Sequence, residues 1–170
     1  MFRTFMCLGV IFILGTGCVN LAPLTTEHII PIDPALLGLW ENVAGEAEGN
    51  PSKDRLVIMP WSKTEYLAVH PLGLEGESYR AYLVEIDGRT LIQAEQIGNH
   101  AGIEYPADRK AYPILSYEIV AGILSVSALN TDVVDGEIKD SAALRRAYLA
   151  NRERPDLFAA PTHFRRVEDQ

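Results

Sequence analysis

Short stretches that mix apolar and polar residues follow one another through most of the chain, and they predict β-strands. Each stretch is rich in Tyr, Val, Ile and Leu, which favour strands, and turn residues separate one stretch from the next. The predicted strands are Leu39 to Val43, Arg55 to Met59, Glu65 to His70, Ser78 to Ile86, Arg89 to Gln96, Tyr112 to Ile119, Ile123 to Leu129 and His163 to Val167.

The connections between these strands predict an antiparallel meander. Asp87-Gly88 supplies the positive φ angles of a tight hairpin turn, and Val120-Ala121-Gly122 predicts a second hairpin. No helix separates the first seven strands, as a parallel sheet would require. We therefore expect a mainly β domain closed as a barrel, with a β-sandwich as the alternative.

One helix is predicted, from Ser141 to Arg152, with Asp140 as its N-cap. Leu144, Ala147 and Tyr148 fall on one side of it. We expect this side to pack on the outside of the β body and the arginines at 145, 146 and 152 to face water.

The N-terminal residues have the order of a secretory signal. Arg3 precedes an unbroken apolar run, Phe5 to Leu14, and the small residues of 15–17 lead to Cys18. This stretch resembles the bacterial lipoprotein signal, although Gly15 stands where that family prefers Leu. The resemblance implies cleavage before Cys18, a diacylglycerol on its sulfur and acylation of the new amino group. A transmembrane anchor is the alternative, but a helix over 4–17 would span only about 21 Å of a bilayer core of about 30 Å.

This reading divides the chain into a signal peptide (1–17), a lipidated cysteine with an extended tether (18–34) and one domain (35–170). Three prolines and the lack of an apolar period favour the tether, whose mobile part we expect to stop near His28. The implied location is a bacterial cell envelope, with a lipid anchor in a membrane. Because Val19, not Asp, follows the cysteine, we expect the periplasmic face of the outer membrane where the host has two membranes.

The net charge of −8 argues against nucleic acid as a partner, because binding to phosphates needs clustered Lys and Arg. It also argues against a polybasic attachment to lipid, so the acyl chains would carry membrane binding. The two cysteines of the chain are Cys7, inside the signal, and Cys18. The folded body therefore has no disulfide and no cysteine-bound metal.

Patterns typical of catalysis are missing. None of the four histidines (28, 70, 100 and 163) has a ligand-spaced partner, so we expect no metal. No Gly-x-Ser-x-Gly elbow and no phosphate loop is present, so we expect neither an enzyme nor a cofactor. The acids at 75, 77, 85, 95 and 104 have the spacing of ordinary strand-edge and loop residues. The aromatic residues at 40, 61, 66, 79 and 82 fit core and rim better than a ligand platform.

Gly38-Leu39-Trp40 follows a short predicted helical turn at residues 34–36 and resembles the Gly-x-Trp that opens lipocalins. In that family the indole closes the floor of a β-barrel and an arginine of the last strand packs over it. The matching arginine here is Arg165 or its neighbour Arg166, and we assign Arg165 to the floor with Gly38 and Trp40. The resemblance implies a lipocalin-like barrel that binds a small apolar or amphipathic ligand in its mouth.

Two functions follow from these patterns. The first is an envelope lipoprotein that binds such a ligand. The second is a non-enzymatic interaction protein, an inhibitor or assembly factor, whose filled barrel presents an acidic surface to a basic protein partner. A hollow interior would favour the first function, and a filled interior would favour the second.

Overall fold

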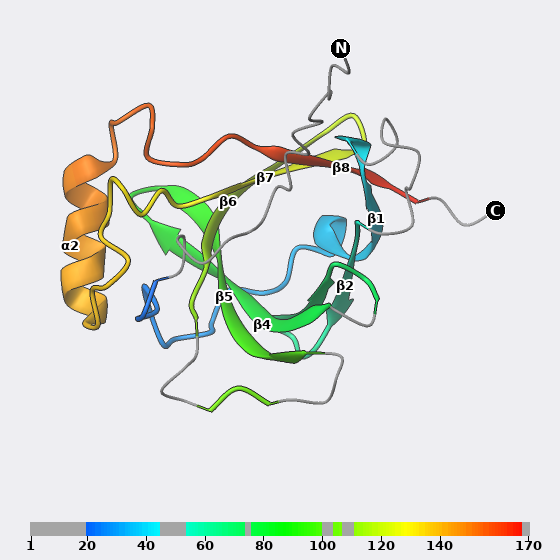
Figure 1. The fold of residues 1–170 in the computed structure, drawn as a ribbon, viewed down its shortest axis with the longest axis horizontal. Coiled ribbons are helices and arrows are strands. Elements are labelled where there is room, and N and C mark those ends of the chain that lie inside the picture. The colour runs from blue at the N-terminus through cyan, green and yellow to red at the C-terminus, as the bar shows by residue number, and fades with distance from the viewer. Residues whose placement is uncertain (1–19, 45–53, 74–75, 100–103, 107–110, 168–170) are drawn as a thin grey trace, which may run out of the picture.

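The computed structural model describes residues 20–44, 54–73, 76–99, 104–106 and 111–167. Within these ranges eight antiparallel strands form a closed barrel in chain order, and the last strand pairs with the first (Figure 1). The mainly β barrel is therefore confirmed, and the sandwich alternative is wrong. The strands are β1 (Gly38–Asn42), β2 (Arg55–Pro60), β3 (Glu65–His70), β4 (Glu77–Ile86), β5 (Arg89–Asn99), β6 (Ile114–Val120), β7 (Ile123–Ala128) and β8 (Thr162–Arg166).

Both predicted hairpin turns are present. Asp87 and Gly88 have φ values of 53° and 72°, and Ala121 and Gly122 have 51° and 78°. These positive angles match the twist of the flanking strands, so each turn holds two neighbouring strands in register. The predicted strand ends agree with the structure to within two residues, except that β5 runs on to Asn99 because it pairs with the whole of β4.

Side chains alternate between the two sides of the barrel wall, and each side has its own hydrophobic cluster. We call the inner cluster the barrel interior. Its buried members are Leu36, Trp40, Ile58, Tyr66, Ala81, Leu83, Ile92, Ala94, Leu124 and Phe164.

The second cluster, which we call the outer core, lies on the outside of β4 and β5. Its buried members are Ala22, Leu24, Tyr82, Val84, Ile86, Leu91, Ile114, Leu129, Val134, Leu144, Tyr148 and Leu157. Two apolar faces on one strand, as at residues 80–86, are therefore explained by a barrel that is packed on both sides of its wall.

The helix α2 (Ser141–Asn151) lies beside the barrel (Figure 1). The Asp140 carboxylate caps it by accepting a 2.7 Å hydrogen bond from the Ala143 amide. Leu144 and Tyr148 are fully buried in the outer core, which confirms the predicted packing face.

The predicted exposure of the helix arginines holds at two of three positions. Arg146 and Arg152 are exposed, and Arg152 lies 3.0 Å from the Asp87 carboxylate at the end of β4. Arg145 is half-buried instead, because the N-terminal segment passes close to it.

The predicted tether needs a correction. Residues 20–33 form neither helix nor strand before a short 3-10 turn, η1 (Pro34–Leu36), and they do not stand away from the domain. Asn20, Ala22 and Leu24 are only 1 to 3% exposed. These alternate residues of the segment fill the space between the barrel wall and α2. The contacts join residues far apart in the sequence, so the prolines of the segment do not predict them. Cys18 lies outside the described residues.

Candidate ligand-binding site at the open end of the barrel

One end of the barrel is closed by η1 and by an aromatic residue beneath it. Trp40 is 0% exposed, and its indole Nε1 donates a 2.9 Å hydrogen bond to the Leu36 carbonyl. The Arg166 guanidinium lies 4.4 Å from the centre of the Trp40 ring and donates to the carbonyls of Leu37, at 2.5 Å, and Ala35. The arginine thereby fixes η1 across the barrel opening and satisfies its free carbonyls.

The assignment of Arg165 to this floor is wrong, because its neighbour Arg166 occupies the position. Successive residues of a strand point to opposite faces, and in β8 the alternation turns Arg166 toward Trp40 and leaves Arg165 exposed. Gly38 belongs to the floor as predicted. Its φ is +132°, and a Cβ there would lie 3.0 Å from the Arg166 guanidinium, so glycine permits the close approach.

Further residues complete the closed end. Ile30 and Ile32 pack against the barrel interior, whereas Ile29 is 73% exposed. The Tyr66 hydroxyl accepts a hydrogen bond from the Asp33 amide at the start of η1. Burial raises the pKa of Tyr66 to about 12. The floor is therefore apolar, with its polar atoms paired.

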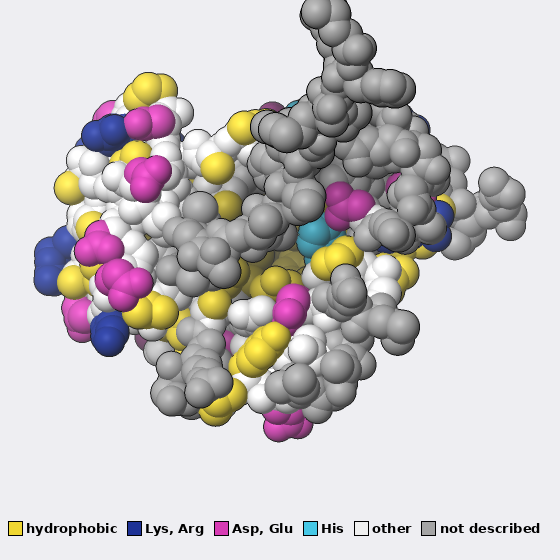
Figure 2. All heavy atoms as spheres, in the orientation of Figure 1, with side chains coloured by type: hydrophobic (Ala, Val, Ile, Leu, Met, Phe, Trp, Pro, Cys, Tyr) yellow, Lys and Arg dark blue, Asp and Glu magenta, His cyan; other side chains and the backbone are white. Residues whose placement is uncertain are grey.

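The opposite end of the barrel is open. Tyr79, Leu115 and Val126 belong to the inner face, yet each keeps part of its surface accessible. Figure 2 looks into this end and shows a hollow in the middle of the face, with hydrophobic side chains inside it. The interior is therefore sealed at one end and accessible at the other.

A polar cluster lies at the open end where β1, β2 and β3 meet. His70 Nε2 is 2.7 Å from Asp54 Oδ1, and the Asn42 side-chain amide donates to the other Asp54 oxygen. The hydrogen bond from His70 is the largest cause of the lowered pKa of Asp54, and burial opposes it. The His70 ring also meets the edge of Phe164, with 5.7 Å between centroids. This cluster therefore joins the polar rim to the apolar interior.

A second polar cluster lies next to the first, on β4 and β5. The Glu77 carboxylate accepts hydrogen bonds from Gln96 Nε2 and from the Tyr105 hydroxyl, both at 3.0 Å. Burial, with Glu77 nearby, raises the pKa of Tyr79 to about 12. Both clusters are built around a carboxylate, so the rim favours ligand groups that donate hydrogen bonds or carry positive charge.

The sequence pattern predicts neither rim cluster. It marks His70 only as a possible metal ligand and Glu77 only as one of several ordinary acids. The signal that could have found them is the pairing of β3 with β4, which sets His70 opposite Glu77. Among the described residues no group of three metal-ligating side chains exists. The two clusters at the open end of the barrel consist of side chains that hydrogen-bond to one another.

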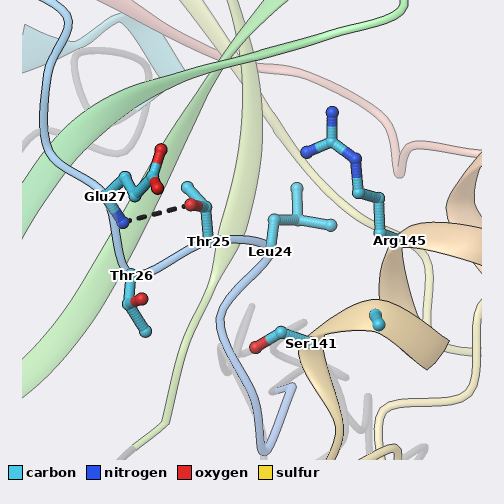
Figure 3. Close-up of a pocket in the computed structure, with 7 residues that line it drawn as sticks. Leu24, Thr25, Thr26, Glu27, Ser141 and Arg145 are labelled. Atoms are coloured by element: carbon cyan, nitrogen blue, oxygen red, sulfur yellow. Dashed lines mark hydrogen bonds between the residues drawn. The ribbon is translucent and has the colours of Figure 1, made fainter.

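A second hollow lies on the surface, between the N-terminal segment and the start of α2 (Figure 3). It is an open groove of about 380 Å³, lined by Leu24 to Glu27 and by Ser141, Ala142 and Arg145. The Thr25 hydroxyl accepts a 3.1 Å hydrogen bond from the Glu27 amide within it. Its lining is mixed and its shape is shallow, so it encloses far less of a ligand than the barrel does.

Comparison with family models, curated proteins and solved structures found no match to this chain. Among the residues that the structure describes, no helix is both long enough and apolar enough to cross a membrane.

Proposed function

We propose that this chain is a lipid-anchored protein of the bacterial cell envelope that holds a small apolar or amphipathic ligand in the open end of its barrel. The observation that carries the proposal is the partial exposure of inward-facing Tyr79, Leu115 and Val126 above a sealed floor. Accessible apolar surface inside a barrel is favourable to cover with an apolar ligand. The lipid anchor is supported by the signal-like order of residues 1–18.

The rim defines the ligand chemistry further. An apolar tail fits against Leu115 and Val126, and a head group with hydrogen-bond donors fits the carboxylates of Asp54 and Glu77. An anionic head group would meet two acids and a net charge of −8, which disfavours it. The preferred ligand is therefore a neutral or cationic amphiphile.

Binding can be tested with N-phenyl-1-naphthylamine, a neutral apolar probe that fluoresces on leaving water. We expect the domain from residue 18, with Cys18→Ala to keep it soluble, to bind the probe. Leu115→Trp should fill the interior and weaken binding at least tenfold. The matched control is Val120→Trp, at a 59% exposed position in the turn at the closed end. No probe binding, or equal binding by both variants, would refute the ligand site.

The anchor can be tested in the host. Wild-type protein should incorporate labelled fatty acid and fractionate with membranes, and Cys18→Ala should lose both properties because no other strong hydrophobic attachment is expected. Acylation that persists in Cys18→Ala would refute the assignment of the lipid to this residue.

The second candidate function, a protein that binds a basic partner, rests on the net charge of −8 and on a different observation of the surface. Trp61, at the β2–β3 turn, and Val120, at the β6–β7 turn, are 54% and 59% exposed at the closed end. Exposed aromatic residues are common at protein interfaces. Native mass spectrometry of protein purified from its host separates the two functions, because a bound small molecule supports the first and a bound protein supports the second.

A further inference from the structure

The N-terminal segment is tied to the outside of the barrel by specific hydrogen bonds. Near its start the Asn20 carbonyl accepts from the Tyr112 amide at 2.9 Å, and the Leu21 amide donates to the Gly136 carbonyl at 3.0 Å. Further along, the Leu24 amide donates to Gln93 Oε1 at 2.7 Å. Gln93 is 0% exposed, so this contact is fully protected from water.

The segment has a defined direction along the barrel. Its first contact, Tyr112, lies just before β6, at the open end. Farther along, His28 pairs with Glu65 at the start of β3, and the Ile32 amide donates to the Lys63 carbonyl in the turn at the closed end, at 3.0 Å. The chain therefore enters the domain at the open end and descends the outer wall to the floor.

This path fixes where a lipid on Cys18 would lie. Cys18 is two residues before Asn20, which is 1% exposed and held in place. Two residues span at most about 7 Å. A lipid on Cys18 is thus attached within that distance of Asn20, which contacts Tyr112 and Gly136 on the side of the barrel where the segment enters, and no long spacer separates the domain from the bilayer.

We propose that the anchor holds the open end of the barrel against the membrane, so that the ligand is a lipid-like amphiphile that passes directly between the bilayer and the barrel. The inference rests on the proposed function and names the source of its ligand. Leu72, at the open end of β3, is 38% exposed, which suits a rim in contact with lipid. The closed end, with Trp61 and Val120, then points into the aqueous space.

The orientation can be measured because the domain contains no cysteine and Cys18 carries the thioether of the anchor. Leu72→Cys and Val120→Cys each add one reactive thiol, at exposed apolar positions on opposite ends. Each full-length variant is purified in acylated form, labelled with bimane and reconstituted into phosphatidylcholine vesicles that contain brominated lipid. We expect at least twofold quenching of the label at 72 and none at 120.

The outcomes separate this inference from the proposed function. Quenching at 120 rather than 72, or equal quenching, in protein whose acylation is verified by mass spectrometry would overturn the orientation and leave the anchor intact. An unacylated chain would overturn the anchor and the orientation together. Quenching at 72 without binding of the naphthylamine probe would support the orientation and refute the ligand site. Native Trp61 gives an independent check, since quenching of its fluorescence by brominated lipid would mean that the closed end touches the bilayer.

Discussion

The barrel interior and the outer core differ in how completely they exclude water. The outer core is covered by the wall of β4 and β5, by α2 and by the N-terminal segment, and its buried side chains are nearly inaccessible to water. The barrel interior is equally dry around Trp40 but leaves Leu115 and Val126 accessible near the open end. One molecule therefore holds a sealed cluster and a partly open one on the two faces of the same strands.

The difference indicates that the outer core contributes more to the stability of the domain than the open part of the barrel interior does. A chain without disulfides must gain stability from buried apolar area, and a barrel that leaves space inside gives up part of that area. The outer core supplies buried apolar area that does not depend on what the barrel interior holds.

The largest effect should come from a charge in the outer core. Leu144→Asp places an unpaired carboxylate among fully buried apolar side chains, so we expect a loss of more than about 4 kcal/mol and an unfolded domain at room temperature. Circular dichroism and denaturant titration measure it. Arg146→Ala, on the exposed side of the same helix, should change the free energy of unfolding by less than about 0.5 kcal/mol. A silent Leu144→Asp would mean that α2 does not stabilise the fold.

The next largest effect is expected at the barrel floor. Trp40→Ala removes a fully buried indole and the surface on which Arg166 stacks, so we expect a loss of about 3 to 5 kcal/mol. Trp61→Ala is the control, because Trp61 is 54% exposed and its replacement should cost less than about 1 kcal/mol. Equal effects in urea melts would show that the floor adds no stability of its own.

A matched pair of leucines on one barrel wall compares the two clusters directly. Leu91→Ala, in the outer core, should cost about 2 to 5 kcal/mol because it leaves a closed cavity. Leu115→Ala, in the half-open interior, should cost about 1 kcal/mol because water already reaches that side chain. Thermal melts of the ligand-free domain test the difference. If Leu115→Ala were the more damaging change, the interior would be a filled core and the ligand site would fail.

Most of the fold could be predicted because local patterns determine it. The Asp87-Gly88 turn and the Asp140 cap each depend on residues close together in the sequence, and both are present. The choice between Arg165 and Arg166 failed because a shift of one residue reverses the face of a strand. Sequence alone does not set the register of β8 against β1.

The sequence predicts where the candidate site lies, at the mouth of a barrel, but not which side chains form its rim. The resemblance of Gly38-Leu39-Trp40 to lipocalins pointed to a barrel mouth, but the rim depends on pairs far apart in the chain, such as Asp54 with His70. The docking of residues 20–24 likewise depends on Gln93, about seventy positions away. Such contacts follow from the closed barrel and cannot be inferred before it is known.

The last comparison concerns Glu65 of β3, whose carboxylate pairs with His28 of the N-terminal segment and with Arg80 of β4. Glu65 is 7% exposed, and both His28 and Arg80 donate to its carboxylate. Burial raises the pKa of Glu65, but the hydrogen bonds from His28 and Arg80 outweigh it, so the pKa is lowered overall. The carboxylate therefore adds stability that is present above the pKa of the unfolded chain, about 4.3, and is lost as the pH falls through the lower folded value.

Glu65→Gln should accordingly reduce the free energy of unfolding by about 1 to 2 kcal/mol at neutral pH, the range for a hydrogen bond to a charged group that keeps some contact with water. It should also flatten the fall in stability below about pH 4.3, leaving the part that arises from Asp54, whose pKa is lowered as well. Urea titrations between about pH 3 and 7 measure both changes. Glu85→Gln, at an exposed position of β4, is the matched control and should leave the pH profile as it is. A Glu65→Gln profile that keeps the full wild-type slope would mean that the ion pairs contribute nothing to holding the segment, which its apolar contacts and its other hydrogen bonds would then keep on the wall.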